Sequence, residues 1–146
     1  MRNAYKYYIF LNDFDGAAAL SAVHLLSAAL VPAVPEVNRA LRLAPDAELI
    51  QITRLFKEND GARVLTSSYF SGVAFLGLLR VSAQRFESVP LSVVIADEHN
   101  LRDRHIDELL SVRTPCEQDA ALRELAYGTP ALFMKSLTDS TSGDAP

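Results

Sequence analysis

The stretch LSVVIADEHN, residues 91–100, decides which fold the sequence predicts. Its first six residues are apolar except for one serine and contain a Val-Val-Ile run, which is typical of a buried β-strand. Polar residues follow at once, beginning with Asp97 and including His99. We therefore predict a strand over residues 91–96 that ends in an acidic cluster.

The same arrangement occurs near the N-terminus. Residues 5–11 (YKYYIFL) are largely aromatic and aliphatic, and they run into the turn-forming sequence NDFDG at residues 12–16. This pattern predicts a second buried strand, followed by a loop that carries Asp13 and Asp15.

The remaining segments alternate in pattern between helix and strand. A further short strand is predicted at residues 62–66. Helices are predicted at residues 17–30, 36–43, 47–59, 70–80, 103–112, 117–125 and 131–137. Strands that alternate with helices predict an α/β fold, with a Rossmann-like, mostly parallel sheet flanked by helices on both faces.

Length and composition limit the domain organisation. A chain of 146 residues, 49% of them hydrophobic and 22% charged, has enough apolar side chains for one core. We predict a single α/β domain over residues 1–137. Residues 138–146 (TDSTSGDAP) are small and polar, and they are predicted to be disordered.

Charge and cysteine content bear on the location of the protein. The formal net charge is −4, which argues against broad nonspecific nucleic-acid binding. Cys116 is the single cysteine, so an internal disulfide is excluded and a reducing compartment is expected. No apolar run reaches the length of a membrane span, and the N-terminus lacks the apolar segment of a signal peptide. The sequence therefore predicts a cytoplasmic protein with no membrane partner.

The two acidic clusters predict a metal site. In a parallel sheet the carboxyl ends of the strands meet at one edge, which would bring together Asp13, Asp15, Asp97 and His99. Three carboxylates and one imidazole suit Mn²⁺ or Mg²⁺. A hydroxide bound to such a metal could cleave a phosphoester, and Asp97 and His99 would then be the catalytic residues. The alternative is that the Asp-x-Asp-Gly turn only caps a helix and that His99 lies at the surface.

Four segments resemble motifs of the DHH phosphoesterases, especially the RecJ-type single-strand exonucleases, and they occur in the order of that family. They are IFLNDFDGAAAL (9–20), DGARVLTSS (60–68), VVIADEHNL (93–101) and ELAYGTPALFMKSL (124–137). The resemblance implies one or two Mn²⁺ ions held by Asp13, Asp15, Asp97 and His99.

The sequence departs from this family at two ligand positions. Ser68, or its neighbour Ser67, stands where the second motif has an aspartate, and Glu98 stands where the third motif has its first histidine. The family's substrate-binding second domain is also missing from this sequence. We therefore predict a catalytically degraded DHH-like domain that serves as a binding or scaffold subunit of a larger, nucleic-acid-processing assembly. The alternative is an active Mn²⁺-dependent phosphoesterase that acts on nucleotides or single-stranded nucleic acid.

A further alternative is a haloacid-dehalogenase-like phosphatase. The Asp-x-Asp-Gly turn, the run into Thr66 and the Ile-Ala-Asp-Glu segment around Asp97 follow the order of that family's motifs. That family needs a lysine before its last motif, but the basic residues between Thr66 and Asp97 are Arg80 and Arg85. Ala17 also replaces the usual threonine after the motif glycine.

Two apolar stretches, residues 17–30 and 73–79, are more apolar than a small monomer requires. They predict a protein partner or a homo-oligomer. The other interpretation is that both stretches are buried against the sheet. Under the DHH resemblance, nucleic acid or a nucleotide is the expected ligand.

Overall fold

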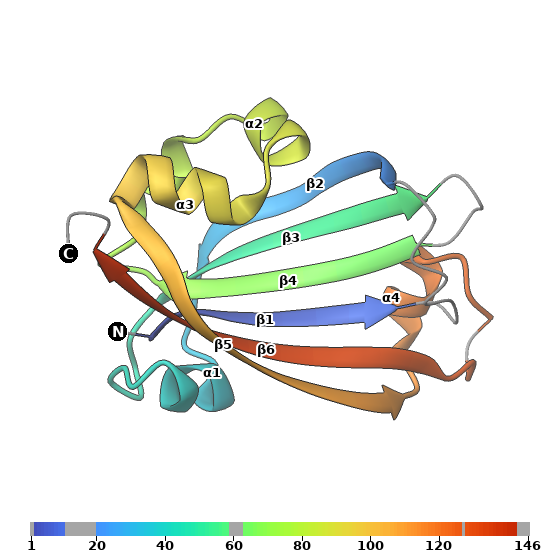
Figure 1. The fold of residues 1–146 in the computed structure, drawn as a ribbon. Helices are drawn as coiled ribbons and strands as arrows, with labels where there is room; N and C mark the ends of the chain where they lie inside the picture. Colours follow the sequence, from blue (N-terminus) through green and yellow to red (C-terminus); the bar gives the residue numbers. More distant parts are fainter. Residues whose placement is uncertain (1, 11–19, 59–62, 127, 143–146) are drawn as a thin grey trace.

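The computed structural model describes residues 2–10, 20–58, 63–126 and 128–142 (Figure 1). The described strands form one six-stranded sheet in the order β2-β3-β4-β1-β6-β5. They are β1 (Arg2–Phe10), β2 (Leu20–Val31), β3 (Leu49–Glu58), β4 (Arg63–Ser71), β5 (Leu101–Arg113) and β6 (Ala131–Ser142). Each neighbouring pair in this sheet is antiparallel. The predicted Rossmann-like, mostly parallel sheet is therefore wrong.

Short helices cover parts of both faces of this sheet. The 3₁₀ helix η1 (Leu76–Arg80) lies with α2 (Ala83–Ser88) and α3 (Leu91–His99) over one face, and α1 (Pro35–Ala40) and α4 (Glu117–Leu122) lie on the other (Figure 1). Within the described part of the chain, no helix is long and apolar enough to cross a membrane.

The alternation of side chains along β3 divides the core between the two faces. Ile50 and Ile52 point toward α2 and α3 and are fully buried there. The other buried members of this main cluster are Phe70, Phe75, Leu78, Phe86, Leu91, Val94 and Ile95. Leu49 faces the other way and packs against Val37 and Leu41 of α1 in a smaller cluster. The larger core therefore lies under α2 and α3.

The segment that was predicted as the clearest strand forms most of α3 instead. Pro90 precedes the first helical residue, and its φ of −55° leads into a helix. The buried residues Leu91, Val94 and Ile95 are spaced as one helical face, a periodicity that the β-branched composition concealed. Asn100 ends the helix in the left-handed conformation, with φ 52°.

Five predicted helices are wrong. The described residues of 17–30, 103–112 and 131–137 lie in β2, β5 and β6, and those of 47–59 lie in β3 from Leu49 on. Residues 70–80 contain the end of β4, a turn and η1. Alanine, leucine and charged residues favour helices by less than about 1 kcal/mol per residue. Strand pairing and burial against neighbouring strands outweigh so small a preference.

Four other predicted elements are confirmed as far as the described residues extend. The strands at residues 5–11 and 62–66 correspond to β1 and β4, and the helices at residues 36–43 and 117–125 correspond to α1 and α4. Proline and acidic residues in the first turns of these two helices are signals that do not depend on tertiary contacts.

The predicted disordered tail is wrong over residues 138–142. These residues belong to β6, in which Thr138 and Ser140 are buried. Small polar residues are ordered here because β6 is hydrogen-bonded to β1 on one side and to β5 on the other. Residues 143–146 lie outside the described residues.

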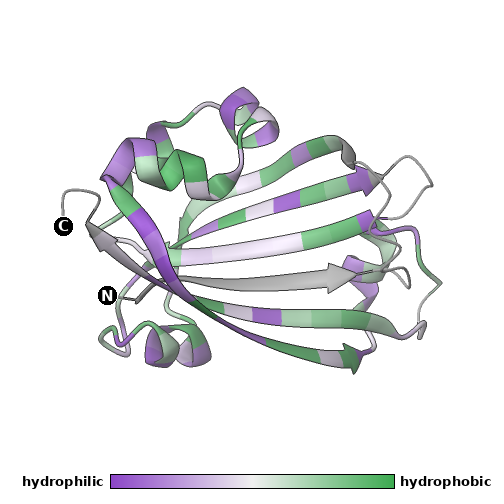
Figure 2. Ribbon diagram, viewed as in Figure 1, coloured by the Kyte–Doolittle hydropathy of each residue, from purple (hydrophilic) through white to green (hydrophobic). Residues whose placement is uncertain are grey.

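Strand β5 forms one edge of the sheet and is exposed along nearly its whole length. Figure 2 shows a hydrophilic first half and a more hydrophobic second half of this strand. Four aliphatic side chains on it, Ile106, Leu109, Leu110 and Val112, are 46–68% exposed. Because an unpaired strand edge offers backbone donors and acceptors, β5 is a surface that can pair with another strand.

We predict that Val94→Ala lowers the free energy of unfolding by about 2 kcal/mol, because it removes two fully buried methyl groups from the main core. Val93→Ala is the matched control, since Val93 is 43% exposed, and it should cost about 0.5 kcal/mol or less. Urea denaturation measures both. Equal costs for the two variants would contradict the helical assignment, because a strand would bury Val93 together with Leu91 and Ile95.

Candidate functional site

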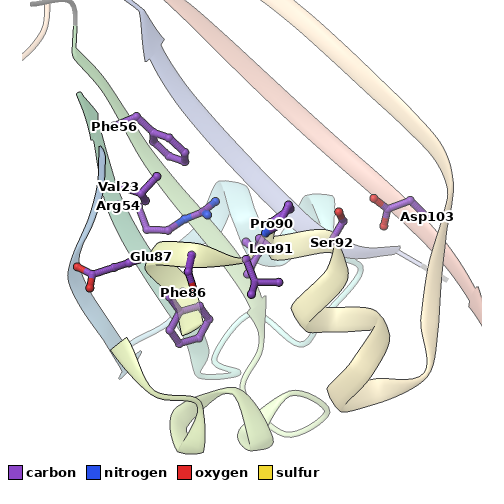
Figure 3. Close-up of a pocket in the computed structure, with 11 residues that line it drawn as sticks. Val23, Arg54, Phe56, Phe86, Glu87, Pro90, Leu91, Ser92 and Asp103 are labelled. Atoms are coloured by element: carbon purple, nitrogen blue, oxygen red, sulfur yellow. The ribbon is translucent and has the colours of Figure 1, made fainter. Parts of the chain in front are cut away.

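A cavity of about 470 Å³ lies between the sheet and the layer formed by α2 and α3. Its volume falls within the range of about 300–1,000 Å³ that is common for small-molecule sites. The wall combines apolar and charged side chains, among them Arg54, Phe56, Phe86, Glu87, Leu91 and Asp103 (Figure 3). These residues come from β3, α2, α3 and β5, so a molecule in the cavity would touch four elements at once.

Arg54 supplies the positive charge of the cavity. It projects from β3 toward the segment that connects α2 and α3 (Figure 3), and it is only 5% exposed. Its Cζ atom lies 5.0 Å from the centre of the Phe56 ring, which is a cation–π contact. A guanidinium stays protonated at physiological pH and presents planar donors that suit a carboxylate or phosphate group.

Two carboxylates lie in the same wall but differ in their contacts. The Glu87 carboxylate accepts a hydrogen bond of 2.9 Å from the backbone N–H of Leu25, which attaches α2 to strand β2. Asp103 reaches the cavity from β5, and its carboxylate accepts a long contact of 3.5 Å from the Ser140 hydroxyl (Figure 3). Glu87 is therefore engaged in holding the wall together, whereas Asp103 retains accepting capacity for a ligand.

Three buried hydroxyls lie on the strands that form this face of the sheet. Thr66 is directly opposite Arg54 in the pairing of β3 with β4, and Ser68 is opposite Ile52, so both share the face of the cavity. The Oγ1 atoms of Thr66 and Thr138 and the Oγ atom of Ser68 have no hydrogen-bond partner among the described residues. Figure 2 shows the resulting pale, weakly polar stretch in the middle of β4. Hydroxyls in this condition cost about 1–3 kcal/mol each. Thr66, Ser68 and Thr138 lie beneath the surface and are not among the residues that line the cavity.

The predicted metal ligands are not brought together within the described part of the chain. Asp13 and Asp15 lie outside the described residues. Asp97 is on α3 and forms an ion pair with Arg85 of α2, which links the two helices. No group of three or more His, Cys, Asp and Glu side chains among the described residues is placed to hold a metal ion. Metal binding by all four predicted residues, with Asp97 and His99 as catalytic groups, stays a prediction.

His99 ends α3 and packs against the main core rather than facing the cavity. Its ring centre lies 4.8 Å from that of Phe75. Its Nε2 atom is buried and has no hydrogen-bond partner in the described ranges. Burial lowers the pKa of His99, and the nearby carboxylate of Glu98 opposes this effect.

Arg54, the main polar residue of the cavity, was not identified from the sequence. It lies in a segment that we predicted as a helix, whose residues 50–53 (IQIT) also alternate with period two. A strand interpretation of that alternation would have placed Arg54 on the same face as Ile50 and Ile52. A charged residue in line with core positions is a signal for a functional site.

The sequence matches the UTRA domain family over residues 20–145. A search of curated protein sequences finds no match.

Three solved structures share the fold. The C-terminal domain of Yurk from Bacillus subtilis has 15% identity and a TM-score of 0.66, over 79% of this chain and 88% of that chain. The ligand-binding domain of a protein assigned to the GntR family of transcriptional regulators, from Bordetella bronchiseptica, has 18% identity and a TM-score of 0.64, over 92% of both chains. The third is PhnF from Mycobacterium smegmatis, with 18% identity and a TM-score of 0.64, over 80% of this chain and 57% of that chain.

We predict that the stability of the protein falls as the pH drops below about 6.5, the usual pKa of an unfolded histidine. Because His99 has a lowered pKa when folded, the unfolded state binds more protons in this window, and protonation favours unfolding. His99→Gln should flatten the pH dependence of the free energy of unfolding between about pH 7 and pH 5.5. His24→Gln is the control, since His24 is exposed on β2. An unchanged slope in His99→Gln would contradict this prediction.

Proposed function

This chain belongs to the UTRA domain family, and from that premise we propose that it is the effector-binding domain of a GntR-type transcriptional regulator. The observation that carries the proposal is the cavity between the sheet and the α2–α3 layer, with the buried Arg54 in its wall. The effector would be a small molecule that changes how a DNA-binding domain of the regulator engages DNA. Such a protein works in the cytoplasm, where the chromosome is accessible.

The family membership overturns the resemblance to DHH phosphoesterases and the haloacid-dehalogenase alternative. It also replaces both functions that rested on them, the degraded DHH-like scaffold and the Mn²⁺-dependent phosphoesterase. The motif order was misleading because the segment at residues 93–101 is not a strand that ends in ligands but the end of α3 and the start of β5. Ser67 and Ser68, which we aligned with a ligand position, lie inside β4.

The charges of the cavity support an effector that is a small organic anion with hydroxyl or amino groups. Arg54 would pair with a carboxylate or phosphate of the molecule. Asp103 would accept hydrogen bonds from its hydroxyl or amino groups on the β5 side. The aromatic rings of Phe56 and Phe86 would contact its carbon skeleton.

The position of the cavity supports a regulatory role. A ligand in the cavity would contact β3, α2, α3 and β5 at once. The polar contact between α2 and α3 is the ion pair of Arg85 and Asp97, and because both groups are partly exposed it contributes little stability. The two helices can therefore change their position relative to each other without losing a strong polar contact, while Phe86, Val94 and Ile95 hold both on the main core. Because β5 follows α3 directly, with Asn100 as the single residue between them, such an adjustment would be transmitted to the exposed edge of the sheet.

We also propose that this edge forms a homodimer. Two copies of β5 would pair antiparallel about a two-fold axis at Ile106, which extends the sheet across both copies. In this register His105 lies opposite Asp107 of the second copy, a pair that occurs twice, whereas Arg104 is the residue skipped at the register shift of β5. Shifting the axis by one residue to Asp107 places two aspartates opposite each other, so charge complementarity favours the register at Ile106.

For the effector site, we predict that Arg54→Met weakens binding of an anionic effector by about 10- to 100-fold, because it removes a charge-assisted hydrogen bond of about 1.5–3 kcal/mol. A thermal-shift screen of sugar phosphates, amino acids and dicarboxylates identifies the ligand, and calorimetry measures the affinity. Arg80→Met is the control, since Arg80 is an exposed arginine outside the cavity. An effector that binds both variants equally well would contradict the proposed site.

For the dimer, we predict that Ile106→Lys produces monomers in sedimentation analysis, because two lysines would meet at the two-fold axis. Leu26→Lys on β2, at the other edge of the sheet, should leave the dimer intact. A chain that is monomeric without substitution, or an Ile106→Lys variant that remains dimeric, would exclude this interface.

A further inference from the structure

A second cavity, of about 440 Å³, lies on the opposite face of the sheet, between β2, β3, β4 and α4. Figure 1 shows α4 toward the other end of the sheet from α2 and α3. Three leucines, Leu26, Leu65 and Leu122, form the apolar part of the wall of this second cavity. Its polar part consists of Ser27, Gln51, Thr53, Ser67, Gln118 and Asp119. Uncharged hydrogen-bonding groups therefore dominate this cavity, in contrast to the first one.

Two hydroxyls in the wall retain most of their capacity to bind a ligand. The Oγ1 atom of Thr53 and the Oγ atom of Ser67 lie 3.4 Å apart. A normal hydrogen bond between hydroxyls is about 2.7–2.8 Å long, so this one is weak. A hydroxyl of a bound molecule that bridges them from the cavity could donate to one and accept from the other.

The amide of Gln51 is held in place by a neighbour. Its Nε2 atom donates a hydrogen bond of 2.9 Å to the phenolic oxygen of Tyr69. Burial raises the pKa of Tyr69, so the phenol is neutral at physiological pH. A fixed amide loses little side-chain entropy when it binds a ligand.

The charges near this cavity disfavour ionic ligands. None of the described residues that line it is Lys or Arg, and Asp119 would repel an anion. Arg123, four residues further along, is almost fully buried, and burial lowers its pKa to about 10 while Asp119 raises it. Arg123 is therefore still protonated near neutral pH and offsets the charge of Asp119, which reduces the attraction for an amine.

We propose that this cavity is a second binding site and that its ligand is a neutral polyhydroxylated molecule of the size of a monosaccharide. Amides, hydroxyls and a carboxylate would bind its hydroxyl groups, and the leucines would contact its carbon skeleton. The proposal does not rest on the proposed effector site, which lies on the other face of the sheet and contains Arg54.

The two sites share strand β3. Thr53 lines the second cavity and the next residue, Arg54, lines the first, because successive side chains point to opposite faces. A ligand that orders β3 from one side would therefore change the affinity for a ligand on the other side, and this coupling is reciprocal.

The test is an NMR titration of the full chain with glucose, galactose, mannose and inositol, which follows the side-chain amide signals of Gln51 and Gln118. We expect saturable shifts of both signals with at least one of the four compounds. Thr53→Val should weaken that binding about fivefold, because it removes a hydrogen bond of about 1 kcal/mol with little change in shape. Thr66→Val, a matched change on the opposite face of the sheet, should leave the affinity unchanged.

The absence of saturable shifts with all four compounds, or an unchanged affinity in Thr53→Val, would overturn the proposal. Ser67→Ala serves as the second test if Thr53→Val fails to fold. Glucose 6-phosphate tests the charge argument, since it should bind the second cavity at least tenfold more weakly than glucose. Equal shifts of the Gln118 signal with both compounds would also overturn the neutral ligand class.

Discussion

Strand β3 lies between β2 and β4, and its successive side chains point to opposite faces of the sheet. On one face, Ile50 and Ile52 anchor the helices α2 and α3, and further along the same row Arg54 reaches the first cavity. On the other face, Leu49 anchors α1, and the odd-numbered polar residues that follow it line the second cavity. A shift of β3 by one residue in its pairing would exchange these faces, so the core and both cavities depend on the same register.

The polar groups inside this sheet are costly for stability. Arg54 is buried beside Phe56, and Thr66 and Ser68 are fully buried, with hydroxyls that lack partners among the described residues. Apolar side chains at such positions would pack at lower cost. The main core under α2 and α3 lies on the same face and offsets that cost, so Arg54 can stay in the wall of the first cavity, where a ligand can reach it. Binding of a ligand that pairs with Arg54 would stabilise the folded state by mass action.

Local signals in the sequence were sufficient for elements whose ends are set by their own residues. The aromatic run of β1 was recognised as a strand, and α1 begins at Pro35, a favoured first helical residue. The composition of β2, rich in alanine and leucine, indicated a helix, because helix propensity reflects the isolated chain and not its neighbours. The valines and isoleucine of α3 indicated a strand for the same reason. Both errors suggested alternating strands and helices, and the parallel sheet and the shared edge for Asp13 and Asp97 followed from that.

The sequence by itself determined that the chain is large enough for one core, and it determined the local conformation of β1, α1 and α4. Its single cysteine excludes an internal disulfide. Only the tertiary structure decided that segments of intermediate propensity pair as antiparallel strands, because the backbone hydrogen bonds and side-chain burial that favour a strand come from residues distant in sequence. The same holds for the site. Arg54 and Asp103 line one cavity because the sheet and its helices bring β3 and β5 to the same space, and nothing near either residue in the sequence encodes that approach.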